Sequence, residues 1–579
     1  MRSLTGLILL AVVPTLLQAQ GPVAGPASPT IVPAPATKLP RTHAPKQTKS
    51  DITADDLMTR LYIFADDSMQ GRDAGTAGNM RGTDYIAREV ARMGLVPMGE
   101  NGTFFQTLPF KTRSADPASS FTAGGTALSY GSEWVGRGAQ SFSKQDLATI
   151  YAGSLADTTS TLTPEQTAGK MIVVSFPTGG GNRALRNPSR RFPNVAAIAV
   201  IGPPQLMGQL RRPQSFVDDP ANPPPAAAAG APPTIFLTQE GAAKVFDGDV
   251  AALQPGAAGK TVSVDLKMMV TPVPFPARNV VAVIPGNDPA LKGQYIAIGA
   301  HNDHIGMTAN PVDHDSMRIF LHRVRPGGAE DNAKQATPED QAQINADLAA
   351  WRSAHPGTER LDSISNGADD DGSGSVSVLE IAEKLQSMKK KLKRSVIFVW
   401  HVGEERGLLG SAWFTDHPTV PRDSIVAQLN MDMVGRGDAW DVTGASKDGA
   451  VLHGSPGYLQ IVGSRRLSTE LGDIIEKVNK DKGHNLTFDY AMDANGHPMN
   501  IYCRSDHYEY ARYGIPIAFF TTGGHSDYHQ VTDEPEYIDY AHMTKVDRMV
   551  ADVAAHLANL DHRVVVDHEK PDPKGACRQ

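Results

Sequence analysis

The hydrophobic pattern after residue 277 predicts an α/β fold. Five runs there are mostly apolar and rich in β-branched or aromatic residues: 278–284, 295–300, 396–400, 425–431 and 515–520. Such runs are typical of strands that are buried on both faces of a largely parallel sheet. Segments with helical periodicity lie between them, for example the one with Val378, Ile381 and Leu385 on one side. We therefore expect a mixed, mainly parallel central sheet flanked by helices.

The pattern before this region is different. Two helical segments between residues 52 and 95 precede a stretch of short β-like runs, such as 171–175, which are separated by loops rich in Gly and Pro. This change of pattern predicts a smaller β-rich domain at 116–270, inserted into a larger α/β domain made of residues 49–115 and 271–565. A single continuous domain with long loops is the alternative.

A second interruption, at 307–366, separates two of the predicted strands. A loop of this length inside a compact domain is usually functional or partly disordered. It carries one helix signal, with Thr337 as the cap and Pro338 in the first turn, followed by an apolar face of Ile344, Leu348 and Trp351. Both ends of the interruption adjoin segments rich in His and Asp, so we expect it near the active site, as a wall or lid over the substrate cleft. A surface decoration is the alternative.

The first 48 residues predict export. Arg2, an apolar stretch from Leu4 to Leu17 and the following Gln18-Ala19-Gln20 form a secretory signal pattern over residues 1–20, too short for a spanning helix. Residues 21–48 are rich in Pro, Ala and Thr and are expected to be a linker. We expect a periplasmic or extracellular protein with no membrane span after removal of the signal, although an N-terminal anchor is the alternative.

Composition narrows the function classes. The 579 residues carry a net charge of -8, and the chain therefore lacks the basic footprint of a nucleic-acid-binding protein. Its two cysteines, Cys503 and Cys577, have the opportunity to pair in an oxidising compartment. The sequence leaves that pairing and the oligomeric state open.

Candidate metal ligands occur in five segments, each at the end of a predicted strand or the start of a helix: His301, Asp370, Glu404 with Glu405, Asp432, and His529. In α/β sheets, ligands bind beyond the carboxyl ends of the strands. Each residue alone has an ordinary explanation, such as a helix cap, a solvated loop or a core histidine. Together, two imidazoles and several carboxylates suit a pair of divalent ions, and one carboxylate can bridge them. The absence of Cys from the set favours a catalytic site over a structural zinc site.

These motifs, in this order, resemble the dizinc exopeptidase family that includes secreted bacterial leucyl aminopeptidase and aminopeptidase S. Glutamate carboxypeptidase II, glutaminyl cyclase and the transferrin receptor are relatives. The resemblance covers about residues 52–110 and 275–560, and the inserted piece resembles a protease-associated domain. It implies two Zn²⁺ ions per chain, with other divalent ions also possible, and a peptide substrate.

The resemblance also implies a role for each motif residue. One ion is held by His301 and Asp432, the other by Glu405 and His529, and Asp370 bridges the two.

Three further roles follow from the same resemblance. Glu404 is the general base, Tyr528 donates to the oxyanion, and Asp303 orients His301. Residues without an assigned role also lie in family-like motifs: His304, Asp506 and His525.

The expected function is a secreted zinc aminopeptidase that removes N-terminal residues from peptides by a metal-activated water. A carboxypeptidase or dipeptidase uses the same ligands and stays open as an alternative. A glutaminyl cyclase-like acyltransferase and a non-catalytic binding relative are further alternatives. The binding relative is expected to lack several ligands, whereas this sequence has all of them.

Overall fold

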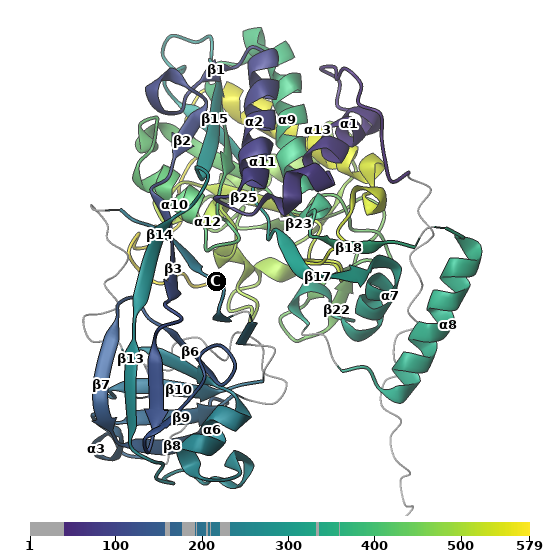
Figure 1. Cartoon of the computed structure of the whole chain (residues 1–579). Helices are drawn as coiled ribbons and strands as arrows, with labels where there is room; N and C mark the ends of the chain where they lie inside the picture. The colour runs from purple at the N-terminus through teal and green to yellow at the C-terminus, as the bar shows by residue number, and fades with distance from the viewer. Residues whose placement is uncertain are drawn as a thin grey trace, which may run out of the picture.

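The chain was analysed as a computed structural model (Figure 1). It describes residues 40–579 except 157–161, 177–191, 193, 204–206, 209, 220–231, 332–334 and 358. The predicted signal peptide at 1–20 and most of the predicted linker at 21–48 lie outside the described residues. Among the helices of the described part, none is both long and apolar enough to cross a membrane.

A nine-stranded mixed sheet forms the centre of the larger part of the molecule. Its strands run in the order β1-β15-β19-β16-β20-β25-β23-β24, and β2 pairs with β15. The four parallel neighbours in the middle are β19 (Ser395–His401), β16 (Tyr295–His301), β20 (Ile425–Met431) and β25 (Ile517–Thr521). Antiparallel neighbours flank them: β15 (Arg278–Ile284) on one side and β23 (Tyr458–Val462) on the other. The remaining edge strands are β1 (Val96–Pro97), β2 (Phe105–Thr107) and β24 (Thr487–Asp489). The predicted α/β class with a mainly parallel mixed centre is confirmed.

Helices cover both faces of this sheet. Alternate residues of β19 point to opposite sides, so Phe398 and Trp400 join one apolar core while Ile397 and Val399 join another. The first core contains residues of α1 (Ala54–Phe64), α2 (Ala77–Arg92), α9 (Gly374–Ser387), α11 (Thr469–Asp481) and α13 (Tyr540–Asn559). The second contains residues of α10 (Leu409–Asp416) and α12 (His507–Ala511). Burial on both sides explains why the five predicted strands are mostly apolar.

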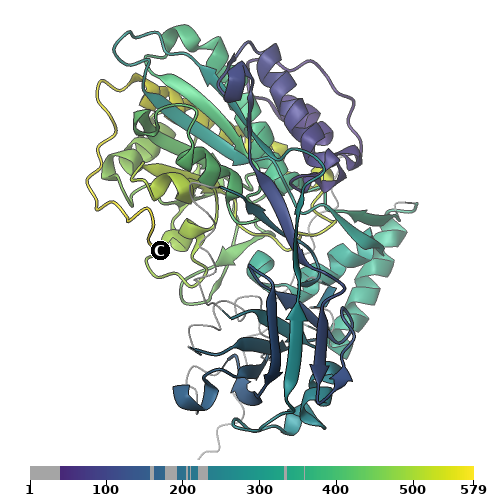
Figure 2. The same ribbon diagram turned by 60° about the vertical axis from the view of Figure 1, so that its left-hand side comes forward.

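A separate lobe lies below this layer structure in Figure 2 and has its own apolar core around Phe121 and Trp134. One of its sheets contains β6 (Trp134–Arg137), β12 (Thr234–Leu237), β10 (Ala197–Ile201), β9 (Met171–Ser175) and β8 (Thr149–Ser154). The other contains β5 (Thr126–Ala127), β4 (Ser120–Ala123), β13 (Val262–Leu266) and β7 (Phe142–Leu147). The chain enters and leaves through the antiparallel pair β3 (Phe110–Ala115) and β14 (Met268–Pro272). β11 (Gln214–Val217) also pairs with β3, and the helices α3 (Pro164–Thr167) and α6 (Gln239–Phe246) belong to the same stretch.

The interruption at 307–366 contains more regular structure than its sequence predicts. Its predicted helix is α8 (Pro338–Ala354), capped by Thr337, and only Ile344 of that helix is buried. The sequence missed α7 (His314–Val324), because the buried residues of this helix include His314 and Asp315 and break the apolar pattern. The short strands β17 (Met307–Asp313) and β18 (Leu361–Ile364) pair with each other at its base. Figure 1 shows α8 at the outer edge, with α7 between it and the rest of the domain.

The two cysteines form a disulfide. The Cα atoms of Cys503 and Cys577 lie 5.9 Å apart, and 74 positions separate them in sequence. The bond therefore joins the C-terminal tail, which follows α13, to the segment that begins at 501 with a short 3₁₀ helix.

We expect Cys577→Ser to lower the free energy of unfolding by about 2–4 kcal/mol, because the closed loop restricts the unfolded chain. Denaturant unfolding of the variant and of the oxidised and reduced parent protein measures this. Reduction should destabilise the parent and leave the variant unchanged. A variant as stable as the oxidised parent contradicts the expectation.

Candidate metal centre

The predicted ligands meet at the carboxyl ends of the parallel strands. His301 is the last residue of β16, Glu405 follows β19, and Asp432 follows β20. His529 lies in the loop after β25, and Asp370 lies in the turn before α9. Parallel neighbours end at the same edge of the sheet, so strand order brings these side chains together.

Two groups of ligand atoms share one carboxylate. Asp370 Oδ1 lies 3.1 Å from His301 Nε2, while Asp370 Oδ2 lies 3.1 Å from His529 Nε2. Asp432 Oδ1 completes the first group at 3.7 Å from His301 Nε2. Glu405 Oε2 completes the second at 2.9 Å from His529 Nε2. The structure thus gathers all five sequence-predicted ligands, with Asp370 between two sites.

The donor set fits two divalent ions. Two ligand atoms of a tetrahedral zinc ion with bonds of about 2.0–2.1 Å lie roughly 3.3 Å apart, close to the separations found here. Within the part of the chain that the structure describes, three buried atoms that face this centre lack a hydrogen-bond partner: His301 Nε2, His529 Nε2 and Asp370 Oδ2. Buried polar atoms normally have partners, so their orphaned state indicates that a cation belongs between them.

The three consecutive aspartates in the turn before α9, Asp369 to Asp371, have different partners. Asp369 accepts from the backbone N–H of Gly435, and Asp371 accepts from that of His301. Both of these carboxylates therefore hold the turn against the segments that carry Gly435 and His301. The Asp370 carboxylate faces the metal centre. Asp533 holds the turn from the other side, because its carboxylate accepts from the N–H groups of Asp369 and Asp370.

Gly367 and Arg72 shape the approach to this turn. Gly367 has a φ of 55°, and a Cβ there would collide with the Asp370 carbonyl and the His304 ring. Arg72 is fully buried and donates to the carbonyls of Asn366 and Gly367 at 2.6 and 2.9 Å. Position 367 therefore requires glycine, because its backbone is left-handed and lies against the His304 ring. The buried guanidinium of Arg72 holds the carbonyls of Asn366 and Gly367 in place.

Asp303, which the sequence predicts to orient His301, contacts it through the backbone. The carbonyl of Asp303, rather than its carboxylate, lies 3.0 Å from His301 Nδ1, which donates to it when Nε2 faces a metal. The carboxylate Oδ1 is 3.9 Å from that nitrogen and accepts instead from the N–H groups of Gly403 and Glu404. Asp303 therefore orients His301 through its backbone and the Glu404 segment through its side chain.

Glu404 occupies a different position from its neighbour Glu405. Its carboxylate lies 4.0 Å from His301 Nε2 and borders a cavity, whereas both oxygens of Glu405 contact histidines. Burial raises the pKa of Glu404 well above its usual value; the nearby charge of His301 acts in the opposite direction, and that of Asp432 adds to the rise. A carboxylate with a raised pKa and access to a cavity is suited to accept a proton.

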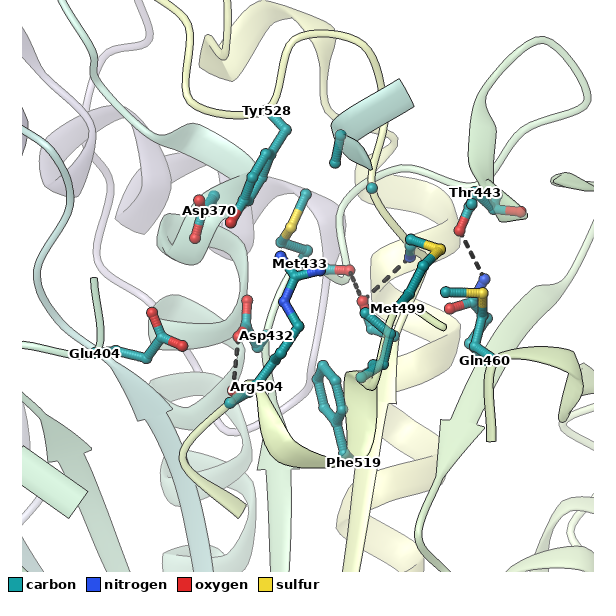
Figure 3. Close-up of a pocket in the computed structure, with 18 residues that line it drawn as sticks. Asp370, Glu404, Asp432, Met433, Thr443, Gln460, Met499, Arg504, Phe519 and Tyr528 are labelled. Atoms are coloured by element: carbon teal, nitrogen blue, oxygen red, sulfur yellow. Dashed lines mark hydrogen bonds between the residues drawn. The ribbon is translucent and has the colours of Figure 1, made fainter. Parts of the chain in front are cut away.

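The cavity beside the metal centre has a volume of about 90 Å³. One side of it is apolar and is formed by Met433, Met492, Met499, Ile501 and Phe519. Figure 3 shows Tyr528 and Arg504 reaching into it near Asp370 and Asp432. Ala329, from the 307–366 interruption, also lines it.

The charges of the centre favour cations. Burial alone opposes protonation of His529, yet Glu405 and Asp370 raise its pKa to about 10. The pKa of His301 is also well above its usual value, because Asp432 and Asp370 outweigh burial. Burial opposes ionisation of Glu405, but His529 and His304 lower its pKa to about 2. The carboxylates that raise the pKa of these two histidines also favour the binding of a divalent cation.

Sequence reasoning left His304 without a role, and the structure places it in the second group. Its Nδ1 lies 2.8 Å from Glu405 Oε1 and 3.6 Å from Asp370 Oδ2. The available signal was its position, three residues after His301 in the same strand-end segment. His525 and Asp506, also unassigned, contact Asp369 and His401 and so lie one layer behind the ligands.

A third group with metal-ligand geometry contains its own cation. His314, Asp362 and Glu534 lie within ligand distance of one another, but Arg360 is among them. Its guanidinium lies 2.8 Å from His314 Nε2 and 3.7 Å from Asp362 Oδ2. A divalent ion would meet a fixed positive charge there, so we do not assign this group a metal.

Residues 351–554 match the family model of Peptidase family M28. The match covers about a third of the chain. The M28 match includes Asp370, Glu404 with Glu405, Asp432 and His529. His301 and its strand lie outside the matched range, separated from it by most of the 307–366 interruption.

Curated relatives are fungal aminopeptidases. "Leucine aminopeptidase 1" of Coccidioides posadasii (strain C735) is 32% identical over 201 residues, which are 33% of this chain and 47% of that protein. A "Probable leucine aminopeptidase" of Arthroderma benhamiae is 31% identical over 147 residues, 25% of this chain and 37% of that protein. The chain thus spans less than half the length of these relatives. Among solved structures, an aminopeptidase from Aneurinibacillus sp. strain AM-1 aligns over 90% of this chain and 97% of that chain, at 15% identity and a TM-score of 0.49.

Proposed function

We propose that this protein is a zinc-dependent metallopeptidase, and specifically an aminopeptidase. The observation that carries the proposal is the shared carboxylate: Asp370 faces His301 through one oxygen and His529 through the other, next to an apolar cavity. The M28 match and the fungal leucine aminopeptidases support the same reaction class.

The residues around the metals divide the work of peptide hydrolysis. When bound, two zinc ions supply Lewis acidity, which lowers the pKa of a water and polarises the scissile carbonyl. Glu404 takes the proton of the attacking water and delivers it to the leaving amine. The Tyr528 hydroxyl donates a hydrogen bond to the carbonyl oxygen as negative charge develops there.

The cavity favours an N-terminal residue with an apolar side chain. Its methionine-rich wall provides an adaptable apolar surface, and its volume suits one side chain rather than a folded segment. Glu404 and Asp432 border the same space, so their charges attract the α-ammonium group of a peptide. Together these features select a free N-terminus that carries Leu, Met or a similar residue.

A carboxypeptidase or dipeptidase is the second candidate, and Arg504 favours it. The guanidinium reaches into the cavity beside Tyr528, as Figure 3 shows, and guanidinium is the side chain best matched to a carboxylate. In that reaction Arg504 binds the C-terminal carboxylate of the peptide.

Matched chromogenic substrates separate the two candidates. We expect Leu-p-nitroanilide to be cleaved and its N-acetyl derivative to be at least about 100-fold poorer in kcat/KM, because the capped amine loses a buried charge pair. N-capped dipeptides with a free C-terminus are the complementary series, with Arg504→Met as the variant. Efficient cleavage of that series, with a higher KM in Arg504→Met, would establish the carboxypeptidase instead.

Export is part of the proposal. The Cys503–Cys577 disulfide supports it, because disulfides persist in oxidising compartments such as the periplasm and the extracellular space. The signal pattern at residues 1–20 points the same way.

A further inference from the structure

The loop that carries Tyr528 and His529 is held by the 307–366 interruption. Arg325 ends α7 and is 7% exposed. One of its terminal nitrogens donates to the carbonyls of Ser526 and Tyr528 at 3.0 and 3.2 Å. Its other two nitrogens donate to carbonyls of the interruption itself, so the guanidinium joins two backbone segments into one unit.

Further contacts seat the two segments against each other. The hydroxyl of Ser526 donates to the Arg325 carbonyl at 3.2 Å, and the Ala329 N–H donates to the Gly524 carbonyl at 2.9 Å. His322 and Arg318, from the same helix, lie 3.4 and 3.6 Å from the buried carboxylate of Asp527.

The interruption and the loop approach each other closely where they meet. Gly328 has a φ of 72°, and a Cβ there would collide with the Gly524 carbonyl. A Cβ on Gly524 would in turn collide with the Ala329 side chain. Two glycines therefore face each other where the interruption meets the loop.

The Tyr528 carbonyl belongs to the peptide that joins the oxyanion donor to a metal ligand. His529 has a φ of 60°, which lies in the left-handed region that residues other than glycine rarely adopt. Such a conformation persists only when its surroundings fix it. Arg325 binds the carbonyl immediately before the strained residue, and so controls where both the Tyr528 hydroxyl and the His529 imidazole point.

We propose that Arg325 is a positioning residue for this centre: it locks the Tyr528–His529 peptide, and the interruption thereby becomes a working part of the active site. The inference rests on the proposed peptidase function. Arg325 itself does not border the cavity and acts through the two residues that follow Asp527.

Arg325→Met removes the hydrogen bonds and keeps much of the side-chain volume. Arg323→Met is the matched control, because Arg323 lies on the same helix but pairs with Asp340 of α8, away from the loop. Three quantities are measured for each: zinc affinity by titration of the metal-free protein, amide exchange at 523–534, and kcat and KM with Leu-p-nitroanilide.

We expect Arg325→Met to lose about 10–100-fold in affinity at one of two zinc sites and a similar factor in kcat, with KM changed much less, as is usual when a residue behind a ligand is removed. Amide exchange at 523–534 should accelerate in the metal-free protein. Arg323→Met should match the parent in all three measurements.

Arg325→Lys keeps the charge but cannot bridge the same carbonyls, so we expect intermediate losses of zinc affinity and kcat. If Arg325→Met fails to fold, this variant tests the positioning role in its place. Zinc affinity and amide exchange test the positioning role even if the parent cleaves none of the peptides, so failure of the proposed function is recognised separately. A folded Arg325 variant with parental zinc affinities, exchange and kcat overturns the proposal. Equal losses in the Arg323 control also overturn it, because they would assign the effect to α7 as a whole.

Discussion

Removal of metal should abolish activity, lowering the rate by at least about 10³-fold. Lewis acidity contributes several kcal/mol to such reactions, and each 1.36 kcal/mol is a factor of ten. Without cations, the carboxylates of Asp370, Glu405 and Asp432 face protonated histidines, and the site provides only Glu404 and Tyr528 to a substrate.

Dialysis against a chelator, followed by metal analysis and stepwise addition of zinc, checks this expectation. Activity should return as about two equivalents of zinc bind, one for each group that contains Asp370. The thermal midpoint should rise over the same titration, because a ligand that binds only the folded state stabilises it. A metal-free preparation with full activity would falsify the assignment of the centre.

Proton release gives the same experiment a second readout. In the metal-free protein the pKa of His529 is raised to about 10, so the imidazole is charged at neutral pH. A metal ligand must be neutral, and zinc binding therefore expels this proton. Because zinc and this proton compete for His529, zinc affinity should increase as the pH rises towards that pKa and should fall in acid. Affinity independent of pH between 5 and 8 would contradict His529 as a ligand.

The parts of the fold that follow from chain-local patterns were predictable. The five strands are recognisable because burial on both faces selects mostly apolar side chains. The parallel strands end at the same edge of the sheet, so the residues that follow them meet there. Strand β23, which lies between β25 and β24, was not predicted, and its antiparallel pairing with β25 is decided by tertiary contacts. Helix α7 was missed for a related reason: it buries His314 and Asp315, and the imidazole of His314 contacts Arg360, 46 positions further along the chain.

The metal ligands could be predicted from the sequence, but the residues that hold their segments in place could not. His301, Asp370 and Asp432 each stand at the end of a recognisable element, which is a local signal. Arg72 and Arg325 donate to backbone carbonyl groups, including some that lie 294 and 201 positions away, and any residue offers a carbonyl, so no spacing in the sequence reports those contacts. The same limit explains why the sequence did not report that Asp303 contacts His301 through its carbonyl.

Replacement of Glu404 and of Glu405 by Gln should give two different defects. Glu404→Gln removes the proton acceptor but keeps the shape, and the Glu404 carboxylate that it replaces lies 4.0 Å from His301 Nε2. We expect it to retain both metals and to lose about 10²–10⁴ in kcat, the usual size of a general-base contribution.

Glu405→Gln should act through the metal instead. Its oxygens lie 2.8 Å from His304 Nδ1 and 2.9 Å from His529 Nε2, inside the second ligand group. An amide is a weaker ligand than a carboxylate and leaves the two imidazoles without their counter-charge. We expect about one zinc ion per chain at low metal concentration, with activity partly restored by excess zinc.

Measuring zinc stoichiometry, kcat and the zinc dependence of the rate for both variants distinguishes a base from a ligand. Each variant is the control for the other, because the substitutions are identical, adjacent and both at the end of β19. The decisive comparison is the response to excess zinc: the rate of Glu405→Gln should climb, while that of Glu404→Gln should stay flat at full metal occupancy. If both variants bind the same amount of zinc and lose the same fraction of the rate, the two glutamates share one role and Glu404 is not the base.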